Sequence, residues 1–250
     1  MTQHFKSSRL RFYLTEPQPC PYLPNRVERK IFTPLSGGHA ADIGDELSTN
    51  GFRRSQNVAY RPQCPGCNAC VATRIIAAEY TASRRDRRII RRNADLTRKV
   101  KPALATEEQY QLFRRYVTAR HAEGGMADMD AYDYASMVED STVRTQVIEY
   151  WGKDEDGDPS LEAVCLTDVM ADGMSMVYSF FNPDREKGSP GRFVIIDHID
   201  IVKALGLPYV YMGYWVDGCR KMQYKVDFPG TQVLISGRWL PLELTEGIKA

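Results

Sequence analysis

Residues 174–216 read MSMVYSFFNPDREKGSPGRFVIIDHIDIVKALGLPYVYMGYWV, and this stretch decides the fold. Its first part, 174–181, is dominated by apolar and aromatic residues, as expected of a strand. After a loop, Pro190 stands where the first turn of a helix accepts proline, and apolar residues then recur up to the breaker Gly206. The last part, 208–216, is apolar enough for a buried strand. The pattern predicts strand, loop, helix and strand.

Two further strands are predicted before this stretch, at 143–151 and 161–170. Three strands, a loop, a helix and a strand follow one another in acetyltransferase-like (GNAT-type) folds. There, a central helix begins at a splayed pair of parallel strands, and the acyl donor binds at its N-terminus. The repeated glycines that hold coenzyme A are missing from Gly188-Ser189-Pro190-Gly191-Arg192. We therefore expect an α+β fold with a mixed sheet, a central helix and an acyl donor other than acetyl-CoA, although a fold alone does not assign a function.

The rest of the chain divides into a turn-rich part and a part with clear helices. Prolines and glycines are frequent in residues 1–80, which are expected to be irregular apart from short strands such as 71–78. A helix is predicted from Thr106, where Gln109 completes a capping box, and a second helix from Asp130.

The net charge of +1 hides an uneven distribution. Residues 1–101 hold 19 Lys and Arg against 8 Asp and Glu, whereas residues 102–250 hold 14 against 24. A basic half joined to an acidic half indicates that one part meets a polyanion, the alternative being solvated charge on both. We expect a basic region with the cysteines at 1–101 and an acyl-transfer domain at 102–250.

Two classes of protein are not expected. No window approaches about 18 uninterrupted apolar residues, so a membrane span is not predicted. The first residues include basic side chains but no apolar segment, which argues against a secretory signal. The six cysteines are therefore interpreted in a reducing cytoplasm, where a cluster indicates metal or redox chemistry before structural disulfides.

Three cysteines have the spacing of metal ligands, in Cys64-Pro-Gly-Cys67-Asn-Ala-Cys70. On a Gly/Pro loop this spacing can present thiolates to one centre, as iron–sulfur and zinc sites require. Cys20 is the natural fourth ligand. The alternative is four reduced, half-buried thiols, or an adventitious disulfide.

An arginine-rich stretch follows, with two isoleucines that would anchor one side of a helix. Its cations are Arg84, Arg85, Arg87, Arg88, Arg91 and Arg92. Arginine binds phosphate oxygens bidentately, so the stretch predicts a polyanion contact. RNA is favoured over duplex DNA because no helix-turn-helix or zinc-finger pattern accompanies it. A solvated run of charge is the alternative, although Asp86 alone offsets the arginines.

Two smaller groups complete the candidates. Arg53 and Arg54 stand between an aromatic residue and a serine, where they can bind a carboxylate or a terminal nucleotide, or form a structural ion pair. The tyrosine-rich run 209–215 is followed by a lysine-bearing segment, 221–225. Tyrosines spaced at two can stack an adenosine beside phosphate-binding lysines, the alternative being a tyrosine-rich core strand.

No covalent nucleophile is evident. The sequence contains no G-x-S-x-G, H-E-x-x-H or P-loop motif, and His198 is a lone histidine that we expect to be structural. An aminoacyl ester is already activated, so attack by an amine needs mainly positioning and charge stabilisation.

At these residues the chain resembles the arginyl-tRNA–protein transferase family, in particular its bacterial aspartate/glutamate leucyltransferase branch. The matching pieces follow in order over nearly the whole chain: Cys20-Pro-Tyr-Leu-Pro-Asn-Arg26, Gly51-Phe-Arg-Arg-Ser55, Tyr60-Arg-Pro-Gln-Cys64 through Cys70, Arg87-Arg88-Ile-Ile-Arg91-Arg92-Asn93, Ser179-Phe-Phe-Asn-Pro183, Gly213-Tyr-Trp-Val216 and Lys221-Met-Gln-Tyr-Lys225.

The resemblance implies a cytoplasmic enzyme of the N-degron pathway. Such an enzyme takes leucine from leucyl-tRNA and transfers it to the N-terminal Asp or Glu of acceptor proteins, which marks them for degradation. No cofactor is expected for the transfer. The resemblance also supports an iron–sulfur role for the N-terminal cysteines, although Leu23 stands where eukaryotic relatives have a second cysteine. It makes no prediction of oligomeric state.

A mechanism follows as a hypothesis, with the arginines of 84–92 on the tRNA acceptor stem. The aminoacyl-adenosine is expected between the strands that end near Phe181 and Tyr214. Candidates for proton transfer are Tyr178, Asp197 and Tyr214. Candidates for substrate contact are Arg53, Arg54, Phe180, Trp215, Lys221, Tyr224 and Lys225, with Arg53, Arg54 or Lys221 on the acidic side chain of the acceptor.

Three alternatives remain at this point. The donor can be arginyl-tRNA with the same acceptors. The chain can be a non-enzymatic RNA-binding protein that senses metal or redox state, which leaves the tyrosine and lysine segment unexplained. A small-molecule acetyltransferase is the third, and the missing glycine loop disfavours it.

Overall fold

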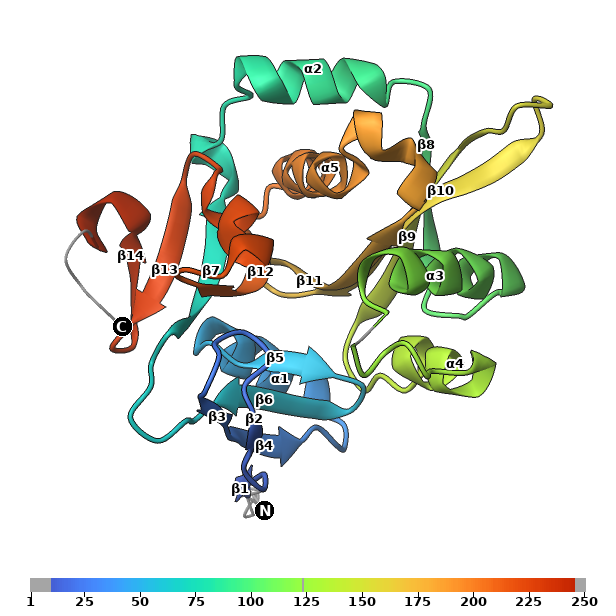
Figure 1. The fold of residues 1–250 in the computed structure, drawn as a ribbon. Helices are drawn as coiled ribbons and strands as arrows, with labels where there is room; N and C mark the ends of the chain where they lie inside the picture. Colours follow the sequence, from blue (N-terminus) through green and yellow to red (C-terminus); the bar gives the residue numbers. More distant parts are fainter. Residues whose placement is uncertain (1–9, 123, 246–250) are drawn as a thin grey trace, which may run out of the picture.

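A computed structural model describes residues 10–122 and 124–245, apart from the side chains of residues 186, 187, 220, 221, 244 and 245. Its main feature is an eight-stranded mixed sheet of order β14-β13-β7-β12-β11-β10-β9-β8 (Figure 1). The strands are β7 (Cys70–Ile76), β8 (Thr97–Pro102), β9 (Thr145–Lys153), β10 (Pro159–Val169), β11 (Gly173–Phe181), β12 (Tyr209–Val216), β13 (Thr231–Ile235) and β14 (Arg238–Pro241). The sheet therefore takes strands from both sides of residue 101.

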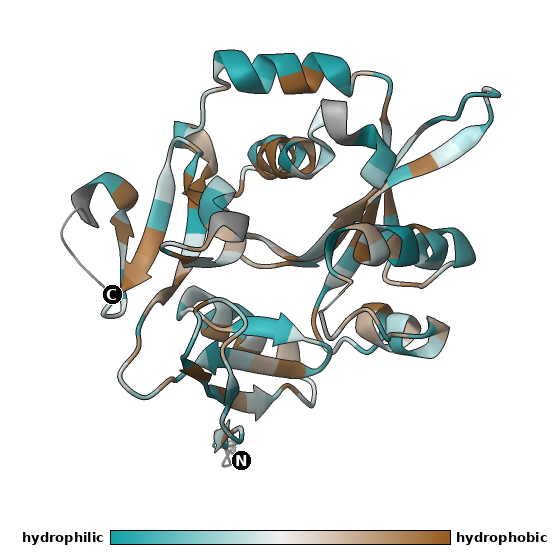
Figure 2. Ribbon diagram, in the orientation of Figure 1, coloured by the Kyte–Doolittle hydropathy of each residue, from teal (hydrophilic) through white to brown (hydrophobic). Residues whose placement is uncertain are grey.

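Helices cover both faces of this sheet. Helix α5 (Pro190–Ala204) packs on one face against β10, β11 and β12, while α3 (Glu107–Arg120) packs against β10 and β11 on the other, with α4 (Ala131–Glu139) beside it. Helix α2 (Arg84–Arg92) lies outside α5 and contacts it (Figure 1). Most of α2 is hydrophilic, whereas α5 includes many hydrophobic residues (Figure 2), several of which belong to the first hydrophobic cluster.

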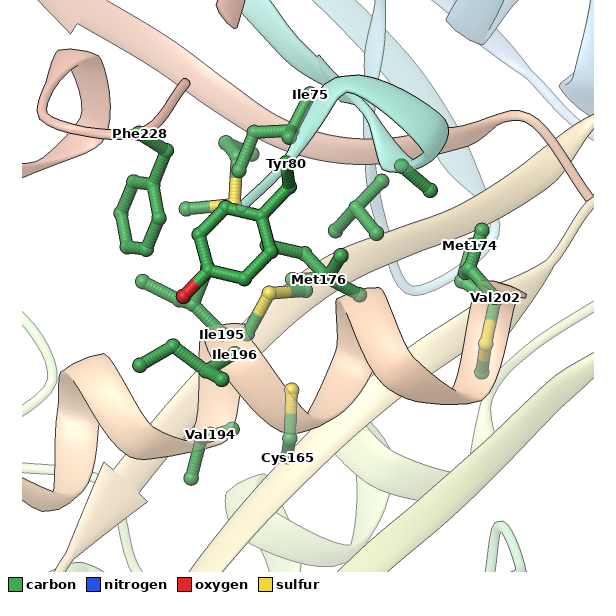
Figure 3. Packing of buried hydrophobic residues seen from close by; sticks show 14 of the residues in the cluster. Ile75, Tyr80, Cys165, Met174, Met176, Val194, Ile195, Ile196, Val202 and Phe228 are labelled. Atoms are coloured by element: carbon green, nitrogen blue, oxygen red, sulfur yellow. The ribbon is translucent and has the colours of Figure 1, made fainter. Parts of the chain in front are cut away.

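Strand β10 explains why the central sheet has a core on each of its two faces. Successive side chains of a strand point to opposite faces. Ala163 and Cys165 therefore pack with α5 in the first hydrophobic cluster, and Val164 and Leu166 pack with α3 in the second. Figure 3 shows the first cluster, to which β11 contributes Met174 and α5 contributes Val202.

The helix boundaries agree with the sequence. Thr106 caps α3 through the predicted capping box, and α4 begins after Asp130, as expected. Asp130 and Ser83 also form capping boxes, which were not predicted from the sequence. His198 is buried between the Thr167 hydroxyl and the Val194 carbonyl, and burial lowers its pKa to about 4. The histidine is therefore a neutral structural residue, as expected.

The N-terminal region is more regular than predicted. A four-stranded sheet of order β1-β4-β6-β5 forms there, with helix α1 and a β2–β3 hairpin. Its elements are β1 (Tyr13–Leu14), β2 (Gln18–Pro19), β3 (Val27–Glu28), β4 (Lys30–Pro34), α1 (Ala40–Thr49), β5 (Arg53–Ser55) and β6 (Val58–Pro62). Leu35, Leu47 and Phe52 give this region a small core of its own. The expectation of irregular structure was therefore wrong for residues 13–62, whereas the strand expected at 71–78 corresponds to β7.

Short 3-10 segments complete the described chain: η1 (Ala77–Glu79), η2 (Pro183–Gly188), η3 (Arg220–Val226) and η4 (Leu242–Thr245). Of these, η3 matters most here because it follows β12 and contacts it. Within the described ranges, no helix has both the length and the apolar composition needed to cross a bilayer.

Candidate active site

The central sheet opens between β11 and β12. These neighbouring strands run parallel and pair only from Gly173 with Tyr209 to Ser175 with Tyr211. Beyond that point each strand has a bulge against its other neighbour, β11 near Val177 and β12 at Met212. An extra residue bends a strand and increases its local twist, so the two strands separate. We call the region between residues 176–181 and 213–216 the strand split.

Arg53 enters the strand split from β5 of the N-terminal sheet. Its Nη2 donates to the carbonyl oxygens of Met176 at 3.0 Å and Val177 at 2.7 Å. The bulge in β11 accounts for two successive carbonyls facing one donor. Among the described residues no carboxylate lies within ion-pair distance of Arg53. The split therefore holds a positive charge that no described acid neutralises.

Lys225 approaches the same split from η3. Its Nζ donates to the carbonyl oxygen of Tyr214 at 2.8 Å. Burial and, to a smaller extent, the charge of Arg53 lower the pKa of Lys225 to about 7. A lysine in this state is part amine and part ammonium near neutral pH, which is the condition for a general base.

Tyr224, the residue before Lys225, stays accessible. The residue is 43% exposed, and burial of its hydroxyl raises the pKa of Tyr224, with Tyr116 acting in the same direction. Tyr116 lies in contact with Phe181, with ring centroids 4.9 Å apart. These rings place aromatic surface beside the open end of the split, where a base can stack. The side chain of the other predicted lysine, Lys221, lies outside the described structure.

Tyr214 is held by backbone groups rather than left available. Its hydroxyl donates toward the carbonyl oxygens of Gly51 at 2.9 Å and Tyr60 at 3.1 Å. Burial raises its pKa far above the usual value for tyrosine. These contacts join β12 to the N-terminal sheet.

The two other candidates for proton transfer lie in other surroundings. Asp197 accepts hydrogen bonds from Arg98 at 2.7 Å and from the Tyr150 hydroxyl at 2.8 Å. Tyr178 packs against the ring of Phe113, and burial raises the pKa of its hydroxyl. Neither group makes a described hydrogen bond to Arg53 or Lys225.

Two predicted substrate contacts have different surroundings. Phe180 is 2% exposed and packs against Phe113 and Tyr134 in the second core cluster, so its ring offers no surface to a ligand. Trp215 keeps a buried indole N–H without a described hydrogen-bond partner. Because buried donors are normally paired, this N–H lacks the partner that a ligand or water would supply.

Arg54 has a structural environment, unlike its neighbour Arg53. Its guanidinium donates to both carboxylate oxygens of Asp168 at 2.7 Å, and both side chains are less than a tenth exposed. Thr145 donates to the same carboxylate. A small pocket of about 10 Å³, room for about one water, lies beside this pair. Arg54 therefore connects the two sheets and is neutralised in doing so.

The arginines of α2 form an exposed surface. All six predicted side chains are exposed, with Arg85 within 3.6 Å of Asp227 and Arg87 bonded to the Ala82 carbonyl. The helix is attached through its one acid. Asp86 is fully buried and accepts from Arg192 Nε, in the first turn of α5, at 2.6 Å.

Arg192 is therefore a junction between three segments. Besides Asp86, it donates from Nη2 to the carbonyl oxygen of Asp227 at 3.1 Å, just after Lys225, and lies over the ring of Phe228. Together these contacts connect the arginine surface, the start of α5 and the lysine segment. Neither Asp86 nor Arg192 was among the predicted site residues. The single acid within a run of arginines was the signal that could have identified them.

The four predicted metal ligands lie near one another. Burial and the neighbouring thiols of Cys20, Cys64 and Cys67 raise the pKa of Cys70 to about 12. Two of the thiols form hydrogen bonds with the backbone. Cys20 accepts one from the N–H of Leu23, and Cys64 donates one to the carbonyl oxygen of Arg29. No disulfide joins them, and among the described residues no three side chains have the arrangement of a metal site. Four thiols near one another are the kind of donor set that zinc and iron–sulfur sites use, and the metal site stays a prediction.

Known proteins with similar sequences carry consistent names. Residues 18–88 match the family described as "Arginine-tRNA-protein transferase, N terminus", and residues 108–235 match its C-terminal counterpart. An aspartate/glutamate leucyltransferase of Cereibacter sphaeroides is 53% identical over 91% of this chain and 82% of its own length. One from Nitrobacter hamburgensis is 51% identical over 97% and 96%.

A solved structure with low sequence identity has a similar fold. The crystal structure of FemX matches 87% of this chain and 73% of its own, with a TM-score of 0.50 and 9% sequence identity. At that identity the match bears on the fold alone. The two family matches and the close relatives together show that this chain belongs to the arginyl-tRNA–protein transferase family, in its aspartate/glutamate leucyltransferase branch.

Proposed function

We propose that this protein transfers leucine from leucyl-tRNA to the N-terminal Asp or Glu of acceptor proteins. The observation that carries the proposal is the strand split, where an unneutralised arginine and a lysine of lowered pKa meet in a chain whose relatives are named aspartate/glutamate leucyltransferase. The reaction uses aminoacyl-tRNA, so we assign it to the cytoplasm, and the acceptor becomes a substrate for degradation.

The fold supports an acyl-transfer assignment of the acetyltransferase-like type. Strands β9 to β11 are antiparallel, α5 follows, and β12 returns parallel to β11 before the two separate. The start of α5 has no glycine loop, and Pro190 at its first turn removes one backbone donor. We therefore propose an aminoacyl ester, not coenzyme A, in the strand split.

The chemistry assigns one role to each cation. The guanidinium of Arg53 can bind the acidic side chain of the acceptor bidentately. The acceptor amine attacks the ester carbonyl, forming the amide bond and releasing the ribose hydroxyl of the tRNA. Lys225, as a neutral amine, accepts the proton that the attacking nitrogen loses and returns it to the leaving ribose oxygen. This assignment replaces Asp197 and Tyr214, whose polar atoms are engaged elsewhere. It also replaces Tyr178, whose ring packs against the second core cluster.

The tRNA is proposed to lie over α2. Six exposed arginines within nine residues suit the phosphates of an acceptor stem. The Asp86–Arg192 contact joins this helix to the first turn of α5, and Arg192 reaches the segment after Lys225. A stem bound on α2 can then direct its terminal adenosine toward Tyr224 and Trp215.

The transfer itself needs no cofactor in this proposal. The cysteines remain a candidate for zinc or an iron–sulfur cluster that would connect the β2–β3 hairpin to the loop before β7. Elemental analysis of protein purified without oxygen tests this, with Cys64→Ser as the comparison. Zinc or iron below one equivalent per chain in both proteins would remove the metal from the proposal.

A transfer assay tests the function directly. Purified protein is given radiolabelled leucyl-tRNA or arginyl-tRNA, with acceptors that begin with Asp, Glu, Lys or Ala. We expect label only from leucyl-tRNA and only on the acidic acceptors. Label from arginyl-tRNA would refute the choice of leucine, and tRNA binding without any transfer would refute the enzymatic assignment.

A further inference from the structure

Gly213 occupies an unusual backbone position in β12. Its φ is +79°, a conformation that residues with a Cβ rarely adopt. It stands directly after the bulge at Met212, and its carbonyl oxygen accepts from the Thr73 hydroxyl at 3.0 Å on β7. Strand β12 is therefore bonded to β7 at the same residue where it separates from β11.

The open side of Gly213 is filled by Arg53. A Cβ built on Gly213 would overlap Nη1 and Cζ of Arg53. This overlap excludes any side chain at 213 while the guanidinium is present. On its other side the guanidinium is bound to the carbonyls of Met176 and Val177. Arg53 thus fits between the bulge of β11 and the bare backbone of β12.

We propose that Gly213 is a positioning residue, whose missing side chain admits Arg53 from the N-terminal sheet into the strand split. The acyl-transfer site is then completed across the two sheets, by a side chain that the central sheet does not itself supply. The role of Arg53 in acceptor binding rests on the proposed function. The geometric claim, that residue 213 controls where Arg53 lies, does not.

The atoms that would move explain the expected behaviour. The end of an arginine is flexible, so an alanine at 213 can be accommodated by withdrawal of Arg53 from the split. The fold then survives with a modest loss from the strained φ, which is separate from the loss of the guanidinium. A matched control exists in Gly206, whose φ is +69° and whose built Cβ meets nothing within 4 Å.

The first test is a double-mutant cycle on transfer. Gly213→Ala is expected to lower kcat/KM for an acceptor with N-terminal Asp by about 100-fold, the same as Arg53→Ala, since both remove one charged contact. The double variant should be no worse than Arg53→Ala alone. Gly206→Ala should stay within about 2-fold of the wild type. Equal activity of Gly213→Ala and wild type would overturn the proposal, as would multiplied losses in the double variant.

The second test needs no activity. Urea unfolding is measured for the wild type, Gly213→Ala, Arg53→Ala and the double variant. If the alanine competes with Arg53, Gly213→Ala should shift the midpoint less in the Arg53→Ala background than in the wild type. Identical shifts in both backgrounds would overturn the claim about residue 213. If the two substitutions are coupled in unfolding but the wild type transfers no leucine, only the proposed function is contradicted.

A third readout concerns Lys225. Arg53 and Cys219 are the charged or titratable groups that act on it, the former lowering its pKa and the latter raising it. Withdrawal of Arg53 by Gly213→Ala should therefore move the acidic limb of the kcat/KM profile to higher pH, as Arg53→Ala does. Gly206→Ala should leave the limb unmoved. An unmoved limb in Gly213→Ala would show that Arg53 keeps its place and would refute the inference.

Discussion

Arg53 and Arg54 are consecutive residues of β5, yet their side chains lie in opposite kinds of surroundings. Arg54 meets the carboxylate of Asp168 at the buried contact between the two sheets. Arg53 meets two backbone carbonyls at the strand split and no described carboxylate. Because successive side chains of a strand point to opposite faces, one strand supplies both a neutralised and an available cation. The difference indicates that Arg54 holds the sheets together while Arg53 is kept for a ligand.

The largest expected effect is on stability, and it distinguishes the buried Arg54–Asp168 pair from a more exposed ion pair between the same two regions. Arg54→Ala leaves the buried carboxylate of Asp168 without its partner, which typically costs about 3–5 kcal/mol of unfolding free energy. Arg144→Ala breaks an exposed pair with Asp45 and should cost about 0–1 kcal/mol. Urea unfolding measures both. Similar losses in the two variants would contradict a structural role particular to Arg54.

The next effect concerns Arg53 and falls on catalysis. Arg53→Ala should lower kcat/KM for an acceptor with N-terminal Asp by about 100-fold, because one charged contact to the acceptor is lost. Its unfolding free energy should change by less than that of Arg54→Ala. The same acceptor with N-terminal Asn is the control and should lose less. If kcat/KM falls equally for the Asp and Asn acceptors, Arg53 does not bind the acceptor carboxylate.

A smaller effect is expected in the pH dependence. Activity should rise with pH through about 7 as Lys225 loses its proton, since burial and Arg53 hold its pKa near that value. Removing the positive charge of Arg53 raises the pKa of Lys225, so the rise should shift to higher pH in Arg53→Ala. The acceptor amine also titrates, at about 7.7–8, and is therefore kept identical in both profiles. A shift to lower pH, or the same limb in Lys225→Met, would contradict this base.

The smallest effects per residue are expected on α2. Arg88→Gln and Arg91→Gln should each weaken tRNA binding and reduce the slope of log K against log salt by about 0.7–0.9. Arg144→Gln, away from α2 and paired with Asp45, should leave the slope unchanged. Filter binding of tRNA over a series of salt concentrations measures all three. If Arg144→Gln reduces the slope as much as Arg88→Gln does, α2 is not the specific tRNA-binding surface.

The sequence predicted most elements of the central sheet because their patterns are local. The apolar run of β12 needs only neighbouring residues to be recognised, and so does the capping box at Thr106. The N-terminal sheet was not predicted because its strands are short and its core is small. A pattern of few apolar residues among prolines and glycines resembles a loop.

The candidate site was predicted in composition but not in arrangement. Arg53, Tyr224 and Lys225 were named from the sequence, and all three lie at the split. The sequence could not distinguish Arg53 from Arg54, because Asp168, which does so, is more than a hundred residues away. The lowered pKa of Lys225 likewise follows from burial, which has no local signature.

The position of β7 bears on how the chain can be synthesised. This strand, Cys70–Ile76, lies between β12 and β13, whose residues come more than 130 positions later in the chain. Contacts between distant segments form slowly, and domains that need them expose unpaired strands until the last partner arrives. We expect β7 to remain unpaired during synthesis until residue 235 has emerged from the ribosome. A nascent chain stalled before that point should be degraded readily by proteases.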